Sequence, residues 1–236
     1  MITSGKLHKE TTSMVVYKHL YNLIVTGTFK PGEWIRERQL KEILGVSSTP
    51  IREALKMLVQ ERLLESIPHH GVRIKNLSMN EIEDIYELRA ELEGLAAQLA
   101  AKRGTMTQFK KMDELLNLIE RKLEENSIIP DSEFLKFNND FHDLIIEVSG
   151  NHALKNTLSH IRAGIDLIRI MAWNNNKGRP YETLKQHRLI VYALKARDPQ
   201  LARLRTQEHI WDSIKLVLQA GKEANGRAIE NETLSI

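Results

Sequence analysis

The chain of 236 residues contains no cysteine. This excludes disulfide bonds, thiolate nucleophiles and cysteine-based zinc or iron–sulfur sites, so any bound metal must be held by imidazole nitrogen or by oxygen. No apolar run approaches the roughly 18 residues of a membrane span. The first residues also lack the apolar stretch of a secretory signal. These absences predict a cytoplasmic protein with no membrane partner.

Common catalytic motifs are missing as well. The sequence has no glycine-rich phosphate loop, no G-x-S-x-G nucleophile motif and no H-E-x-x-H zinc motif. With 42% hydrophobic and 28% charged residues, the composition is that of a globular protein rather than a disordered one. We therefore expect a folded protein that is not an enzyme.

The charge is unevenly distributed along the chain. Residues 1–77 contain twelve Lys or Arg and seven Asp or Glu, whereas the remaining residues contain 22 basic and 24 acidic side chains. The net charge of +3 for the whole chain does not show this difference. A basic segment is typical of nucleic-acid-binding domains, but basic helices that are merely solvated are also common. Charge alone leaves both interpretations open.

Residues 1–77 contain short helical patterns separated by glycine and proline. They predict three helices followed by two extended segments, over about 13–25, 37–44, 50–62, 64–67 and 72–74. The turn between the two extended segments is typical of a hairpin. Three helices and a small hairpin make a winged helix-turn-helix, which binds the major groove of DNA.

Long amphipathic patterns begin at residue 78, where Ser78-Met79-Asn80-Glu81 reads as a helix capping box. They predict six helices, over about 79–103, 107–126, 131–148, 152–175, 180–196 and 199–222. The fold class is therefore mainly α, with an all-helical antiparallel bundle over residues 78–236. Residues 223–236 are expected to form a frayed tail.

The chemistry of DNA binding is concentrated at the start of the third predicted helix. The hydroxyls of Ser48 and Thr49 at a helix N-terminus can bond phosphate oxygens, together with free backbone N–H groups. Arg52, in the first turn, can offer two N–H groups to guanine O6 and N7. Each of these residues alone also fits a capped helix with surface arginines.

The segment from Leu40 to Leu58, including Gly45-Val46-Ser47-Ser48-Thr49-Pro50-Ile51-Arg52-Glu53-Ala54-Leu55, resembles the recognition segment of GntR-type bacterial transcription regulators. The resemblance continues through Arg62-Leu63-Leu64 and His70-Gly71-Val72. It implies DNA contacts at Arg38, Ser48, Thr49, Arg52, His70 and Gly71. Family members usually carry arginine where this chain has Ser48, so one base or phosphate contact is expected to be lost or replaced. The resemblance to the family therefore predicts the fold of this chain better than it predicts its operator sequence.

Three histidines and one asparagine are candidates for a metal site in the second domain. Asn138 and His142 are four residues apart and project from one side of a helix. Apolar neighbours at helical spacing point His187 inward, whereas the direction of His209 is left open. Three imidazoles and one amide oxygen suit a divalent cation, but histidines bonded to carboxylates would show the same spacing.

The order Asn138-x3-His142, Glu147-x-Ser149-Gly150-Asn151, His187, Asp198 and His209 resembles the FCD ligand-binding domain of FadR-like GntR regulators. The resemblance implies a divalent metal, zinc first with manganese or nickel as alternatives, held by Asn138, His142, His187 and His209. Members commonly carry aspartate in place of Asn138. A neutral amide is a weaker ligand and leaves the site about one charge more positive, which favours an anionic effector.

Arg89 gives an independent indication of an anion, because it lies among apolar positions of its helix. A guanidinium there needs a partner, since an isolated buried charge costs several kcal/mol. The partner is either an internal glutamate or the carboxylate of a small organic or sugar acid. Trp173 would close such a pocket with its ring, or simply pack in the core.

Together these features predict a homodimeric bacterial transcription regulator, associated with the nucleoid through DNA binding. Its winged helices would read an inverted repeat in double-stranded DNA, and an acid bound in the helical domain would modulate operator binding. Repression is the expected direction, with activation left open. The alternatives are a helical metal-dependent hydrolase and a non-specific nucleic-acid-binding protein.

Overall fold

The computed structural model describes residues 10–125, 129–175 and 180–233. The side chains at 131, 132, 170–175, 216 and 220–233 lie outside this description. The chain divides into two compact units, residues 1–76 and 77–236. Among the described helices, none combines the length and the apolar character that a membrane crossing needs.

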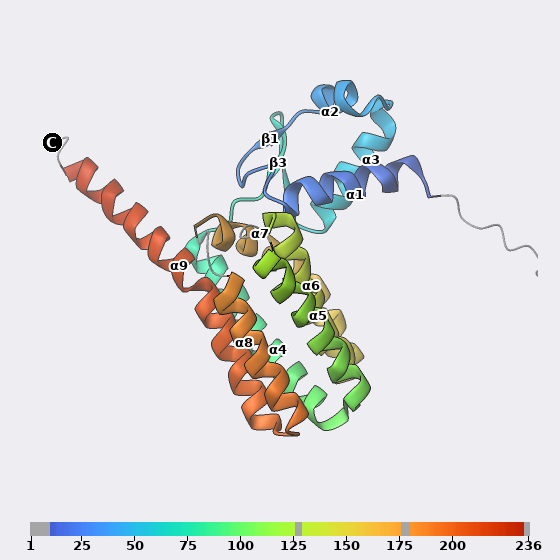
Figure 1. Ribbon diagram of the computed structural model, residues 1–236. Helices are drawn as coiled ribbons and strands as arrows, with labels where there is room; N and C mark the ends of the chain where they lie inside the picture. The colour runs from blue at the N-terminus through green and yellow to red at the C-terminus, as the bar shows by residue number, and fades with distance from the viewer. Residues whose placement is uncertain (1–9, 126–128, 176–179, 234–236) are drawn as a thin grey trace, which may run out of the picture. The chain divides into compact units, whose positions relative to one another are not determined.

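The first unit consists of three helices and a small sheet (Figure 1). The elements are α1 (Thr12–Val25), β1 (Trp34–Ile35), α2 (Glu37–Leu44), α3 (Ser48–Gln60), β2 (Leu64–Ile67) and β3 (Gly71–Ile74). Their core consists of buried aliphatic side chains from the three helices and the sheet, among them Leu20, Ile24, Leu40, Ile51, Leu58, Leu64 and Ile74. The predicted winged helix-turn-helix is confirmed.

The sheet contains one strand more than the sequence predicts. Its order is β1-β3-β2, with both pairings antiparallel. Trp34 pairs with Arg73 in the first pairing, and Leu64 pairs with Ile74 in the second. The two predicted strands are confirmed as β2 and β3. Strand β1 was not predicted, because its two residues are too few to show the apolar–polar alternation of a strand.

A tight turn joins α2 to α3. Gly45 ends α2 with a φ of 65°, a left-handed conformation that glycine adopts without steric cost, and its N–H donates to the carbonyl of Lys41. Ser47 precedes α3, and its side chain makes no capping hydrogen bond. The first-turn N–H groups of α3 are therefore not capped by that side chain.

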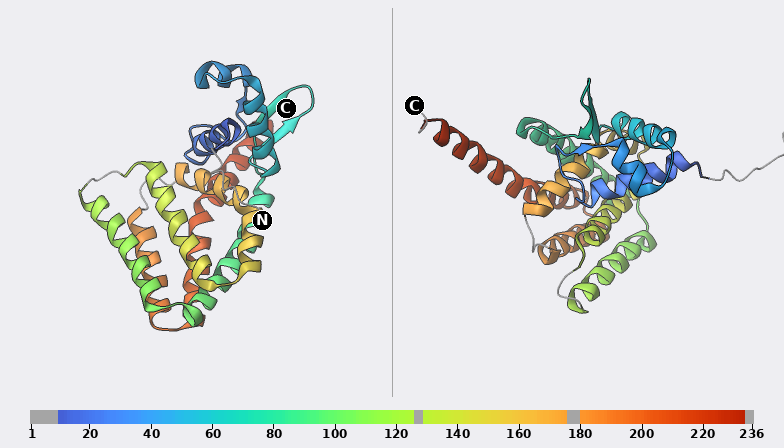
Figure 2. Two further views of the ribbon diagram at one scale, coloured as in Figure 1. Left: turned by 90° about the vertical axis from the view of Figure 1, so that its right-hand side faces the viewer. Right: turned by 90° about the horizontal axis from the view of Figure 1, so that it is seen from above.

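The second unit is a bundle of helices (Figures 1 and 2). They are α4 (Met79–Arg103), α5 (Met106–Glu125), α6 (Asp131–Ser149), α7 (His152–Asn175), α8 (Pro180–Lys195) and α9 (Pro199–Thr233). Helix α4 packs against α6, α7, α8 and α9, while α5 packs against α6 and α8. The predicted all-helical bundle is confirmed, with α4 as its most connected helix.

The sequence predicts the start of α4 correctly but not the end of α9. At the start of α4, the Ser78 hydroxyl accepts from the N–H of Glu81, and the Glu81 carboxylate accepts from the N–H of Ser78, as the capping box predicts. The predicted end of the last helix near residue 222 was wrong, because α9 continues to Thr233. The segment is rich in good helix formers, which offset its glycines. The prediction of a frayed tail concerns residues 223–236, whose side chains lie outside the described part of the structure.

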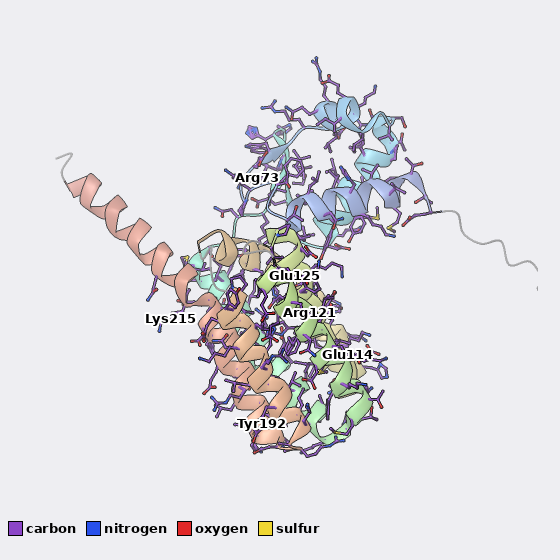
Figure 3. The ribbon with its side chains drawn as sticks, viewed as in Figure 1. Arg73, Glu114, Arg121, Glu125, Tyr192 and Lys215 are labelled. Atoms are coloured by element: carbon purple, nitrogen blue, oxygen red, sulfur yellow. The ribbon has the colours of Figure 1, made fainter. Side chains whose placement is uncertain are left out.

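The helices are amphipathic, and α5 shows this most plainly. Glu114, Arg121 and Glu125 are exposed on one side of it (Figure 3). The opposite side is buried and carries Phe109, Met112, Leu116, Ile119 and Leu123. Spacings of three and four residues put these apolar side chains on one face. Each contributes about 1.5–3 kcal/mol when fully buried.

Gly104 permits a close approach where α4 ends. A Cβ atom at this position would lie 2.6 Å from Cε1 of Phe109 and 2.6 Å from Cγ1 of Val148. Both of these side chains are buried and belong to the core of the bundle. The chain therefore leaves α4 through a space that no side chain can occupy without moving its neighbours.

We expect Gly104→Ala to lower the free energy of unfolding by about 1–3 kcal/mol, because the added methyl group overpacks the core. Urea unfolding of the full chain measures the change. Lys102→Ala is the control, since Lys102 is exposed near the end of the same helix and its change should stay within about 0.5 kcal/mol. Equal midpoints for both variants would contradict the proposed close packing.

Candidate functional site

The residues that the sequence places at DNA-contacting positions lie on the helix-turn-helix and the wing. Arg38 is on α2; Ser48, Thr49 and Arg52 are in the first turns of α3; His70 precedes β3, and Gly71 begins it. All are exposed except Ser48, which is half-buried. The turn between α2 and α3 and the hairpin therefore present these groups on the surface of the first unit.

Both arginines of this set are held by acidic neighbours. Nε of Arg52 donates to Glu37 over 2.8 Å, and Nε of Arg38 donates to Glu42 over 3.1 Å. The side chains of Arg52 and Arg38 remain 65% and 90% exposed. Ion pairs this exposed contribute only about 0–1 kcal/mol, so either guanidinium can exchange its carboxylate for another anion at low cost.

The wing is fixed by contacts around Trp34. The guanidinium of Arg73, labelled in Figure 3, lies 5.6 Å from the Trp34 ring centroid, and its Nε donates to Glu65 over 2.6 Å. The His70 ring meets Trp34 edge-on, with centroids 6.2 Å apart. Strand β1, which the sequence did not reveal, thus supplies the aromatic ring against which His70 rests.

In the second unit, three buried histidines from three helices meet. Nε2 of His209 on α9 lies 3.2 Å from Nε2 of His142 on α6 and 3.2 Å from Nε2 of His187 on α8. All three side chains are at most 3% exposed. His187 stacks on Phe141, with centroids 3.9 Å apart and rings inclined by 16°. His187 points inward as its spacing predicts, and His209, whose direction was open, is also buried.

Glu93 on α4 orients His142. Its Oε2 lies 2.5 Å from Nδ1 of His142. Nδ1 of His142 makes no hydrogen bond of regular geometry among the described residues, so the contact is an ion-pair distance. Because an ionised carboxylate only accepts, this contact favours the tautomer with the proton on Nδ1 and a lone pair on Nε2. Burial opposes the charge of Glu93, but Arg89, His142 and Arg169 outweigh it and hold the pKa of Glu93 well below its ordinary value. In metal sites, a ligating histidine commonly donates its other ring N–H to a carboxylate.

The corresponding contact of His209 is with an amide. Nδ1 of His209 lies 2.8 Å from Oε1 of Gln186 on α8. An amide oxygen also accepts only, so His209 likewise carries its proton on Nδ1 and a lone pair on Nε2. With these tautomers, the Nε2 atoms of His142 and His209 both carry lone pairs and lie 3.2 Å apart. Two acceptors cannot form a hydrogen bond with each other, so this short distance needs another cause.

The cluster fits a divalent cation. Nitrogen ligands at about 2.0–2.1 Å from a tetrahedral zinc ion lie about 3.4 Å from each other. The separations of His209 Nε2 from the other two Nε2 atoms are close to this value, and the ligand atoms of all three histidines lie within 4.8 Å of one another. Burial is the largest cause that lowers the pKa of His142, of His187 and of His209, which favours the neutral form that binds metal. Asn138, half-buried one turn before His142 on α6, offers an amide oxygen from the same helix.

Arg89 has an internal partner, one of the two that the sequence left open. Its Nε donates to Oε1 of Glu93 over 2.7 Å, and its guanidinium lies 5.0 Å from the ring centroid of Tyr86. Arg89 and Glu93 are 1% and 4% exposed. The Glu93 carboxylate thus joins Arg89 to the histidine cluster.

A cavity of about 290 Å³ adjoins the cluster. Its lining includes Glu93, His142, Ile146, Leu158, Arg162 and Arg169. Arg169 on α7 is 7% exposed and donates from Nη1 to Asn139, while its Nε has no hydrogen-bond partner among the described residues. Burial and then the charge of Arg89 lower the pKa of Arg169 to about 10. The cavity therefore has both a cation and a histidine of the cluster in its wall.

Several of these residues escape sequence reasoning. Glu93 had one usable signal, its position four residues after the buried Arg89. Nothing local distinguishes Arg169 or Gln186 from other polar residues of amphipathic helices. Trp173, expected to contact an effector, belongs to α7, but its side chain lies outside the described part of the structure.

A winged helix-turn-helix followed by an all-helical unit is the architecture of DNA-binding transcription regulators. Residues 12–74 match the bacterial regulatory proteins of the gntR family, and residues 84–212 match the FCD domain. The chain belongs to the GntR family of transcription regulators, in the branch that carries an FCD domain.

Relatives over nearly the whole chain agree with this assignment. The chain is 34% identical to the HTH-type transcriptional regulator YdhC of Bacillus subtilis, covering 92% of this chain and 98% of that protein. It is 29% identical to a probable D-xylose utilization operon transcriptional repressor of Paenarthrobacter nicotinovorans, covering 88% and 89%. The solved structure of E. coli McbR has the same fold, with a TM-score of 0.76 at 24% identity, covering 89% and 99%.

These matches bear on one alternative that the sequence left open, the metal-dependent hydrolase. The family consists of transcription regulators that bind DNA, not of enzymes, so the metal-dependent hydrolase is set aside. FCD domains of some members bind metals, and the histidine cluster of this chain has the donors for such a site.

The buried Arg89–Glu93 pair gives a stability prediction. We expect Arg89→Met alone to destabilise the protein by about 3–5 kcal/mol, because it leaves Glu93 charged and uncompensated. The double variant Arg89→Met/Glu93→Gln should recover part of this loss, since it removes both charges. Urea unfolding of the single and double variants measures the coupling. If the losses of unfolding free energy in the two single variants simply add up in the double variant, the ion pair is contradicted. Arg89 would then be a candidate effector ligand again.

Proposed function

We propose that this protein is a metabolite-responsive repressor that acts as a homodimer on nucleoid DNA in the bacterial cytoplasm. Its winged helices would read an inverted repeat, and a small organic or sugar acid bound beside a metal in the helical unit would modulate operator binding. The observation that carries the proposal is the convergence of three Nε2 atoms beside a cavity with a buried arginine. The repressor named for D-xylose utilization supports the direction of control.

The DNA-reading part of the proposal rests on the surface of the first unit. Arg38, Ser48, Thr49, Arg52, His70 and Gly71 are assigned to DNA contact. The first turn of α3 has no side-chain cap from Ser47, so its N–H groups and the positive end of the helix dipole are available to a phosphate. Arg52, in the same turn, can exchange Glu37 for a guanine edge.

We expect Arg52→Ala to weaken binding to an operator by about 1–3 kcal/mol and to relax specificity at one base pair. The probe is a duplex that the wild-type protein selects from a random-sequence library, and fluorescence anisotropy at fixed salt measures affinity. Lys111→Ala, an exposed charge on α5, is the matched control. Equal wild-type affinity for the selected and scrambled duplexes would instead support non-specific binding.

The metal part assigns His142, His187, His209 and Asn138 as ligands. Zinc is the first candidate, with manganese or nickel as alternatives, because three imidazoles and an amide oxygen suit each of them. When bound, the metal supplies positive charge that attracts an anionic effector, and no bond is broken. Glu93 and Gln186 keep the ligating nitrogens free of protons.

The effector part assigns the cavity that Arg169 and His142 line. A carboxylate there would meet the guanidinium of Arg169, whose Nε is otherwise unpartnered in the described structure. Arg89, expected from sequence to bind the acid, would act behind Glu93 rather than by contact, and Trp173 remains a candidate from sequence alone. A coupling of about 1–3 kcal/mol between this cavity and the DNA-binding unit is enough for regulation.

We expect metal-loaded wild-type protein to melt at higher temperature in the presence of one class of small carboxylate. Arg169→Lys should keep the metal and lose most of this shift, because an ammonium cannot bind a carboxylate through two parallel N–H groups. His142→Ala should lose both the metal and the shift. Arg188→Lys, which alters an ion pair with Glu120 away from the cavity, is the control. A full shift in Arg169→Lys would contradict the assigned effector contact.

A further inference from the structure

Gln186 links the histidine cluster to a second side chain beyond it. Its Oε1 lies 2.8 Å from Nδ1 of His209, and its Nε2 donates to Oδ2 of Asp212 over 2.9 Å. Asp212 lies one turn after His209 on α9, while Gln186 precedes His187 on α8. The amide of Gln186, on the helix that supplies His187, therefore contacts two side chains of the helix that supplies His209.

The contact with Asp212 sets which end of the amide meets the histidine. A carboxylate only accepts hydrogen bonds, so it pairs with the NH₂ end of Gln186 and turns the oxygen toward His209. A rotated amide would place its oxygen against the carboxylate of Asp212. That contact between two acceptors would be repulsive, so the observed orientation is favoured.

The orientation of the amide decides which nitrogen of His209 is available. With Oε1 as acceptor, the proton of the neutral imidazole stays on Nδ1, and Nε2 faces His142 and His187 with a lone pair. His142 is held in the same tautomer by a carboxylate, which places a charge beside the ring. The amide does this for His209 without adding charge to the buried cluster.

We infer that Gln186 is a positioning residue of the histidine cluster, which, with its own amide held by Asp212, keeps His209 in its metal-binding tautomer. The inference rests on the metal site under Proposed function. Gln186 and Asp212 also line a surface groove with Lys185 and Glu208.

The first experiment reads the tautomer in metal-free protein from imidazole ¹⁵N chemical shifts. In the wild type, His209 is expected to carry its proton on Nδ1. In Gln186→Leu, which removes the acceptor, the Nε2–H tautomer should become populated. In Gln186→Glu/Asp212→Asn, which restores an accepting oxygen toward His209 and replaces the facing carboxylate by an amide that can donate, the Nδ1–H form should return. An unchanged His209 tautomer in Gln186→Leu would overturn the inference.

The second experiment measures zinc affinity by competition with a chromophoric chelator. We expect Gln186→Leu to bind zinc about 10- to 100-fold more weakly, as for other residues that orient metal ligands, and Gln186→Glu/Asp212→Asn to recover most of the loss. Gln207→Leu is the matched control, because Gln207 lines the same groove from α9 but donates to Glu91 and not to a histidine of the cluster. Circular dichroism checks the fold, and Gln186→Met, which is unbranched, repeats the comparison if the leucine variant unfolds.

The outcomes separate the inference from the function on which it rests. Wild-type protein without zinc affinity would overturn the proposed metal site and the inference together. Zinc binding by the wild type with equal affinity in Gln186→Leu would overturn the inference alone. A loss of affinity in Gln207→Leu equal to that in Gln186→Leu would also overturn it, since the effect would then not depend on contact with His209.

Discussion

The buried carboxylate of Glu93 is the contact on which the second unit depends most. It accepts from Arg89 on one oxygen and faces Nδ1 of His142 with the other, and it lines the cavity. A charge this deeply buried is tolerated only because its partners are held in place. Helix α4 carries both Glu93 and Arg89 and packs against α6, α7, α8 and α9, so packing and polar chemistry constrain the same helix.

The histidine cluster follows from that packing. Each of α6, α8 and α9 contributes one imidazole, and no helix contributes two. The cluster therefore exists only when the bundle is folded, and a metal bound there would stabilise the arrangement of three helices at once. Glu93 and Gln186 differ in charge but have the same effect on the rings they contact, because each turns a nitrogen lone pair inward.

Local patterns predicted much of this molecule. Helical periodicity and capping signals located the helices of both units, and hydroxyl and arginine positions located the α3 start. Helical spacing and the family resemblance singled out the three histidines, which the structure brings together. Arg169 and Gln186 were not found, because their roles arise from tertiary contacts that leave no periodic signal. Strand β1 was not predicted because two residues carry no pattern. The last helix was predicted to end near residue 222 because the sequence after Gly221 loses its apolar periodicity, whereas α9 continues to Thr233 through residues that favour helix.

The central claim is that three Nε2 atoms, turned inward by Glu93 and Gln186, form the metal centre of this regulator. Anomalous X-ray diffraction at the zinc absorption edge, from crystals of the zinc-loaded protein, tests it most directly. The account predicts one strong anomalous peak bonded to Nε2 of His142, His187 and His209. A peak bonded through Nδ1 of any of these rings, or no peak at the cluster, would contradict it.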